Sequence, residues 1–186
     1  MGHAAHTAAS AVFEAGFGRG GHGAGAGLGT AIEAAAFALF AAGSIALAVI
    51  DAREKLLPDR IVFPLYGVGA VGLTLAAWLE HRWAPLVVAL VAGAVLYAIF
   101  YGIAMFGPLG FGDVKLAGVL GLFLGWLGIP VVYAGILLGT FAAALAAVGV
   151  IVVRRVRGLD WRGYELSFGP YLIAGSWAAI LLDLLR

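Results

Sequence analysis

The apolar residues of this chain form long runs, and the segments between the runs hold most of the charged residues. A helix needs roughly 20 apolar residues to cross the hydrocarbon core of a bilayer. The pattern therefore predicts an all-α membrane protein, a polytopic bundle of about six transmembrane helices. The predicted spans cover residues 31–50, 61–79, 85–106, 114–128, 130–153 and 168–185. The fourth span is short and close to the length of a re-entrant helix.

The composition supports a membrane protein independently of the pattern. Of the 186 residues, 63% are hydrophobic and only 11% are charged, and the mean hydropathy is +1.06. Soluble domains are about 45–50% apolar and about 25% charged. Membrane lipid is therefore an expected partner, and nucleic acid is not. The absence of cysteine excludes disulfides, cysteine-ligated zinc and a cysteine nucleophile.

The first 30 residues differ from the remainder, because they are rich in Gly, Ala and His. This composition is typical of a flexible tail, and it lacks the basic start and compact apolar run of a cleaved signal. His3 and His6 could hold a metal, but a tail without function is the favoured interpretation. We expect no metal site and no cofactor, with residues 31–186 forming a single transmembrane domain.

The Lys and Arg residues predict the orientation of the chain, because cytoplasmic loops are enriched in them. Six spans with an external N-terminus place eight of these residues in inner loops and three outside. The inner residues are Arg53, Lys55, Arg60, Lys115, Arg154, Arg155, Arg157 and Arg162. Asp51 and Asp113 then both lie at the cytoplasmic edge of the membrane.

These two aspartates are the candidate chemical groups. Asp51 ends the first apolar run, and Asp113 follows a glycine-rich turn over residues 107–112 and opens an apolar helix. Two ordinary boundary charges are the simpler interpretation, but burying a carboxylate is costly and calls for a reason. Two close carboxylates can share a proton and activate a water molecule. The chain contains no HExxH or G-x-S-x-G motif, so peptide hydrolysis by an aspartate pair is the surviving enzymatic hypothesis.

Three motifs, in order along the chain, resemble those of the type IV prepilin peptidases. G-F-G-D over 110–113 looks like the GxGD signature, and D-A-R-E-K-L-L-P-D over 51–59 resembles the first aspartate motif. S-F-G-P-Y over 167–171 resembles the Phe-Gly-Pro motif that opens the last helix of the family. The resemblance implies a multi-pass aspartic endopeptidase of the cytoplasmic (inner) membrane that removes the leader of a prepilin or pseudopilin substrate. By position, Asp51 and Asp113 match the two catalytic aspartates.

The sequence also departs from the family pattern. Larger members carry a cysteine-containing region with methyltransferase activity, and this chain resembles the short, peptidase-only branch that serves Flp/Tad-type pili. Asp59 stands where the family has asparagine. Ion pairing with the basic residues beside it, Arg53, Lys55 and Arg60, explains its charge, and we assign no catalytic role to Asp59 or to Lys115.

Two alternatives compete with this reading. A transporter or pilus-assembly protein could use the boundary aspartates for ions or protons, although it would want polar groups near the bilayer midplane. A presenilin-type protease would carry a Pro-Ala-Leu motif, which this sequence lacks.

The enzymatic hypothesis makes a structural demand, because a shared water molecule requires the two carboxyl groups to converge. We therefore expect the first and fourth helices to pack side by side at their cytoplasmic ends. Small residues four positions apart, in the pairs Gly121/Gly125 and Gly135/Gly139, predict close contacts between helices elsewhere in the bundle.

Overall fold

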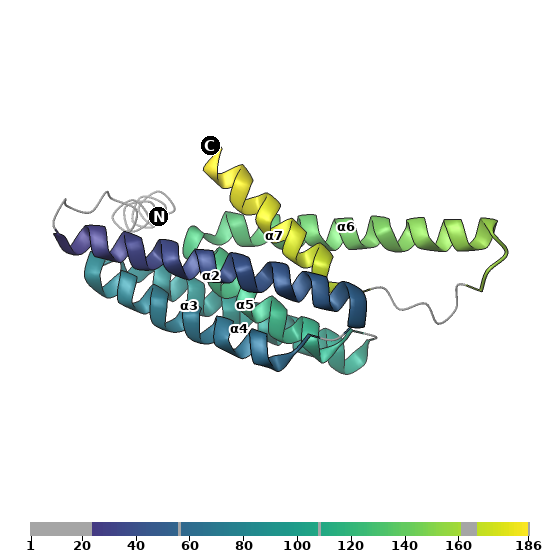
Figure 1. Ribbon diagram of the computed structural model, residues 1–186, viewed down its shortest axis with the longest axis horizontal. Helices are drawn as coiled ribbons and strands as arrows, with labels where there is room; N and C mark the ends of the chain where they lie inside the picture. The colour runs from purple at the N-terminus through teal and green to yellow at the C-terminus, as the bar shows by residue number, and fades with distance from the viewer. Residues whose placement is uncertain (1–23, 56, 108, 161–166, 186) are drawn as a thin grey trace, which may run out of the picture.

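The computed structural model describes residues 24–55, 57–107, 109–160 and 167–185, and this part of the chain is helical without strands (Figure 1). The predicted all-α fold is confirmed. The described residues form six helices, namely α2 (Ala24–Glu54), α3 (Asp59–Glu80), α4 (Trp83–Phe106), α5 (Phe111–Leu127), α6 (Ile129–Val156) and α7 (Gly169–Leu184).

Each predicted span corresponds to one of these helices. Four of them, α2, α3, α4 and α6, are long and apolar enough to cross a membrane, while α5 has 17 residues and α7 has 16. Helix α2 begins at Ala24, inside the segment predicted as a tail. Residues 1–23, with His3 and His6, lie outside the described residues.

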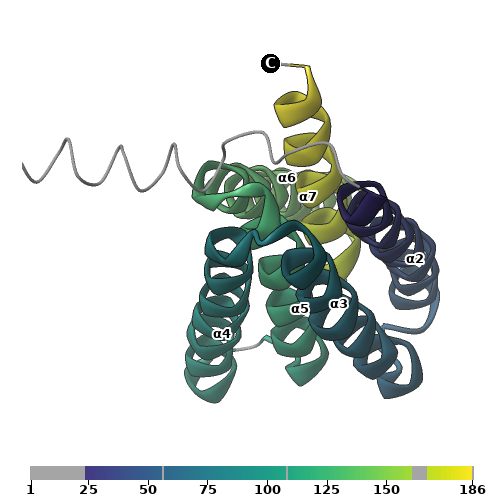
Figure 2. The ribbon, with the colours of Figure 1, turned by 90° about the vertical axis from the view of Figure 1, so that its left-hand side faces the viewer.

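The most extensive contacts join helices that follow each other in the chain, α2 with α3, α4 with α5 and α6 with α7. Helix α5 lies between α3 and α4 in the view along the bundle, with α6 and α7 crossing above it (Figure 2). Almost every residue of α5 from Asp113 to Trp126 is buried. A helix that is apolar on all sides belongs in the interior of a bundle, and α5 has that composition.

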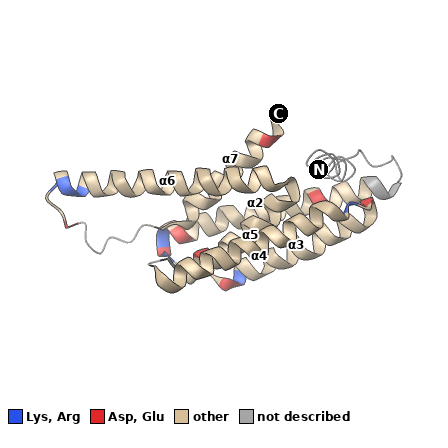
Figure 3. Cartoon of the chain, turned by 180° about the vertical axis from the view of Figure 1, so that it is seen from behind, with Lys and Arg blue, Asp and Glu red and all other residues tan. Residues whose placement is uncertain are grey.

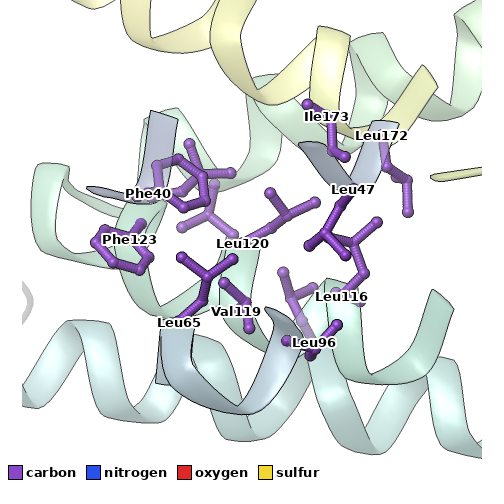
Figure 4. Close-up of a cluster of buried hydrophobic side chains, with 14 of the residues drawn as sticks. Phe40, Leu47, Leu65, Leu96, Leu116, Val119, Leu120, Phe123, Leu172 and Ile173 are labelled. Carbon is purple, nitrogen blue, oxygen red and sulfur yellow. The ribbon is translucent and has the colours of Figure 1, made fainter. Parts of the chain in front are cut away.

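Large side chains from α2 and α7 fill the space around α5 (Figure 4). The rings of Phe40 and Phe123 stack with centroids 4.2 Å apart, and Trp177 stacks on the other side of Phe40 at 5.5 Å. Leu120 and Leu172 are fully buried in the same cluster. This cluster joins the middle of α2 to the middle of α5 through side chains.

Glycines set the closest approach between α4 and α5. A Cβ atom at Gly121 would lie 2.7 Å from the carbonyl oxygen of Ala92, and one at Gly125 would lie 2.8 Å from the Cα atom of Ala89. Backbone cannot move aside as a flexible side chain can, so these positions require glycine. The expected role of the pair Gly121/Gly125 in helix contact is confirmed.

The α6–α7 contact follows the same rule. A Cβ atom at Gly139 would lie 2.9 Å from the Cα atom of Leu172, and one at Gly175 would overlap the backbone of Gly139. A Cβ atom at Gly135 would lie 3.3 Å from the Cα atom of Ser176. Small residues thus let α7 lie directly on α6.

Charged residues gather toward the two ends of the bundle, with uncharged residues along most of the helices between them (Figure 3). Seven of the eight described Lys and Arg residues lie at the end where α5 begins, and Arg82 lies at the other end. There Arg82 contacts Glu80 at 2.9 Å and Glu33 at 3.5 Å, and the indole of Trp126 donates a hydrogen bond to Glu33 at 2.7 Å. This network joins α2, the α3–α4 turn and the end of α5.

Replacing Gly139 by leucine should destabilise the protein by about 1–3 kcal/mol, the usual cost of overpacking. The added side chain has backbone atoms of α7 in its way. Gly149→Leu is a matched control on the same helix, since a Cβ atom at Gly149 meets nothing within 4 Å. Thermal unfolding of the detergent-solubilised protein measures both, and equal melting temperatures for the two variants would contradict the close packing.

Candidate active site

Asp51 lies in the last turn of α2 and is almost fully buried, with 4% of its surface exposed. Its Oδ2 atom accepts a hydrogen bond from the backbone N–H of Gly169 at 3.1 Å. The hydroxyl of Ser167 donates a second, short hydrogen bond to the same oxygen. Both donors come from the start of α7, more than 110 positions away in the sequence.

The start of α7 is shaped to approach Asp51. A Cβ atom at Gly169 would lie 2.5 Å from Oδ2 of Asp51 and 3.4 Å from the side chain of Leu116 on α5. Pro170 stands in the first turn of α7, where its fixed φ suits a helix and its missing N–H costs nothing. The ring of Phe168 lies 6.3 Å from that of Phe100 on α4. The Phe-Gly-Pro segment therefore packs against both α2 and α5 at this end of the bundle.

Asp113 lies in the first turn of α5, ahead of the apolar run 114–128, and 9% of its surface is exposed. Gly110 caps the helix with an extended backbone, and its carbonyl accepts the N–H of Asp113 at 3.1 Å. A Cβ atom at Gly112 would lie 2.9 Å from the side chain of Leu57, so glycine lets the α2–α3 connection approach. The Oδ1 atom of Asp113 is buried without a hydrogen-bond partner among the described residues.

The two carboxyl groups interact electrostatically although they are 62 positions apart in the sequence. Burial, and secondarily the negative charge of Asp51, raise the pKa of Asp113 to about 7. Burial acts because the charged form loses its hydration, and the neighbouring carboxylate acts because like charges repel. Near neutral pH a substantial fraction of Asp113 is thus protonated.

Lys115 follows Asp113 by two residues but serves another contact. Its ammonium group lies 2.6 Å from Oδ1 of Asp59 at the start of α3, and 5.3 Å from the ring centre of Phe63. The hydroxyl of Tyr66 donates to the backbone carbonyl of Lys115 at 2.8 Å. From the sequence, Asp59 was expected to pair with the basic residues beside it, so the distant partner is a correction. The cause is the packing of α3 against α5.

The expected side-by-side packing of the first and fourth helices is also corrected. The closest helical neighbour of α2 is α3, and that of α5 is α4. The start of α7 contacts both helices, since a Cβ atom at Gly169 would meet Asp51 of α2 and Leu116 of α5. At this end α2 and α5 are therefore joined through the start of α7, while Phe40 and Phe123 join them in the middle of the bundle.

Ser167 is a site residue that sequence reasoning missed. It stands at the head of the Phe-Gly-Pro motif, but a single serine in a polar connection carries no signal by itself. Its partner becomes evident only when α7 is placed against α2. In the described part of the chain, no group of three or more His, Cys, Asp or Glu side chains is arranged to hold a metal ion.

Fold and site together define a class: a multi-pass helical membrane protein with a buried acidic pair at one end of its bundle. Residues 38–155, which include both aspartates, match the model of the type IV leader peptidase family. The chain belongs to this family. The predicted family is confirmed.

Curated relatives share the same region. The chain is 31% identical to a prepilin leader peptidase/N-methyltransferase of Aeromonas salmonicida over 141 residues, which cover 74% of this chain and 45% of the relative. A protein of the same name from Stutzerimonas stutzeri is 32% identical over 80% of this chain and 50% of its own length. The protein of the same name from Escherichia coli is 31% identical over 79% of this chain and 63% of its own length. The chain thus spans about half the length of the curated relatives it matches, and no solved structure matches it.

We predict that Asp113 titrates near pH 7, protonated below this value and ionised above it. The carboxyl C=O band in infrared difference spectra, wild type minus Asp113→Asn, measures this directly. The band should be present at pH 5 and lost with a midpoint near 7. Loss of the band with a midpoint near 4, the ordinary value for an aspartate, would contradict the effect of burial.

Proposed function

We propose that this protein is a membrane aspartic endopeptidase that removes the leader peptide from type IV prepilins or pseudopilins, of the Flp/Tad type, at the cytoplasmic face of the inner membrane. The observation that carries the proposal is the buried pair Asp51 and Asp113 within the segment that matches the family. The relatives' name supplies the substrate class, a prepilin leader.

The pair has the properties that hydrolysis without a metal requires. Repulsion between two buried carboxylates favours a state with one proton between them. The ionised carboxylate removes a proton from water while the water oxygen bonds to the peptide carbonyl carbon. The protonated carboxyl gives its proton to the carbonyl oxygen. The tetrahedral intermediate then collapses, the C–N bond breaks, and the nitrogen takes up a proton to leave as an amine.

The position of the pair suits a bond at the membrane surface. Both aspartates lie at the end of the bundle that carries seven of the eight described Lys and Arg residues. Basic residues favour the cytoplasmic side, so this end faces the cytoplasm in our proposal. A leader cut there would leave the apolar helix of the substrate in the bilayer.

A transporter is the alternative, with the aspartates binding ions or protons. Such a protein has its ion site near the midplane, lined by polar groups on discontinuous helices. Here the two buried aspartates lie at helix ends, and the part of the bundle between the ends is filled by aromatic and aliphatic side chains. This placement favours a reaction at the membrane edge.

Asp51→Asn and Asp113→Asn should each lower cleavage of a co-expressed Flp-type prepilin by about 10²–10⁴-fold, the usual contribution of acid–base groups. Asp183→Asn, an exposed acid on α7, is the control and should cleave normally. Mass spectrometry of the pilin measures the cut, and immunoblotting confirms that each variant is in the membrane. Near-normal trimming by Asp51→Asn would exclude the aspartate mechanism.

The natural absence of cysteine permits a clean test of orientation. Leu159→Cys, beyond the basic end of α6, should react with a membrane-impermeant maleimide only after the cytoplasmic side is opened. His81→Cys, in the opposite turn, should react in intact spheroplasts. Reaction of Leu159→Cys from outside would invert the proposed topology, and its substrate would then have to be cut on the other side.

A further inference from the structure

The two aspartates differ in their hydrogen bonding. One oxygen of Asp51 accepts hydrogen bonds from two donors, the Ser167 hydroxyl and the Gly169 N–H. Asp113 has a buried oxygen without any partner among the described residues.

This difference in hydrogen bonding favours the ionised form at one aspartate and the protonated form at the other. Donors to a carboxylate oxygen favour its ionised form, and hydrogen bonds to charged groups are the stronger ones. An ionised Asp113 would instead leave a charged oxygen buried and unpaired, which is costly. The single negative charge of the pair is therefore held on Asp51, and the shared proton on Asp113.

Resting on the proposed peptidase function, we propose that Asp51 is the general base and Asp113 the general acid, and that Ser167 is a positioning residue that keeps Asp51 ionised and correctly oriented. In the first step a water proton moves to Asp51 as the water oxygen bonds to the carbonyl carbon. The proton of Asp113 moves to the carbonyl oxygen in the same step. Asp51 then returns its proton to the leaving nitrogen as the C–N bond breaks, and the hydroxyl of the intermediate restores the proton of Asp113.

Ser167 acts only through Asp51, so the test must separate positioning from packing. Other ionisable groups also lie at this end of the bundle. Those at the end of α2 and the start of α3 are Arg53, Glu54, Lys55, Asp59 and Arg60, and those on α5 and at the end of α6 are Lys115, Arg154, Arg155, Arg157 and Asp160. The tyrosines are Tyr66, Tyr101 and Tyr171. Lys115 is engaged by Asp59, and most of the remaining charged groups are exposed. A shift caused by removing the Ser167 hydroxyl therefore reports on the coupled pair of Asp51 and Asp113, in which Ser167 contacts Asp51.

The experiment measures kcat and KM against pH for the purified full chain in detergent, with a synthetic prepilin peptide as substrate. Ser167→Ala should move the acidic limb of the kcat profile up by about one pH unit, so that kcat falls about tenfold on that limb and little on the plateau, the effect of losing one hydrogen bond to a charged group. KM should not change. Ser167→Thr keeps the hydroxyl and should restore the wild-type limb.

Ser176→Ala is the matched control, because this buried serine of α7 donates to the carbonyl of Leu172 at 2.8 Å and touches neither aspartate. Its profile should coincide with the wild type. A Ser167→Ala enzyme that is slower but has an unmoved acidic limb would overturn the positioning role, as would failure of threonine to restore the limb.

A second measurement tests the division of roles without relying on activity. At pH 6 the infrared band of a protonated carboxyl should be lost in Asp113→Asn and kept in Asp51→Asn. The reverse pattern would overturn the assignment of acid and base while leaving the peptidase proposal intact. Persistent cleavage by Asp51→Asn would instead refute the peptidase mechanism itself.

Discussion

The burial of α5 on every side is the constraint on which this structure depends. An apolar helix of 17 residues, shorter than the four long helices, is enclosed by α3, α4, α6 and α7. Glycines on α5 bring α4 to backbone contact, and the stack of Phe40 on Phe123 links it to α2. Because α5 begins at the end of the bundle, Asp113 in its first turn is buried but lies close to the surface of the bundle.

Burying an ionised carboxyl group costs free energy unless hydrogen-bond donors or a proton stabilise it, and the two aspartates are stabilised differently. The start of α7 supplies Asp51 with two donors, at a contact where only glycine leaves room for the carboxylate. Asp113 has no such donor for its Oδ1 atom, and its raised pKa shows that it is compensated by a proton instead. The electrostatic state of the pair is therefore a property of three helices together.

Sequence reasoning succeeded where a signal is local and periodic. Runs of apolar residues located the six described helices to within four positions, except the start of α2, which lies seven positions before the predicted one (31 − 24). Small residues four apart located helix contacts. It failed where a contact joins distant segments. Asp59 pairs with Lys115 rather than with its basic neighbours, and Ser167 binds Asp51 across more than 110 positions. Such pairings depend on how helices are arranged, which hydrophobicity does not encode.

By itself the sequence determined that this chain is a helical membrane protein, that it belongs with the type IV leader peptidases by its motifs, and that Asp51 and Asp113 are its candidate acids. Length and hydropathy suffice for the first conclusion, since a bilayer accepts few backbone structures. Only the tertiary structure decided what surrounds each acid. The start of α7 contacts both α2 and α5, and the donors that it offers reach Asp51 alone. Hydrogen bonding and burial act over a few ångströms, so the surroundings of each aspartate are set only after the helices pack.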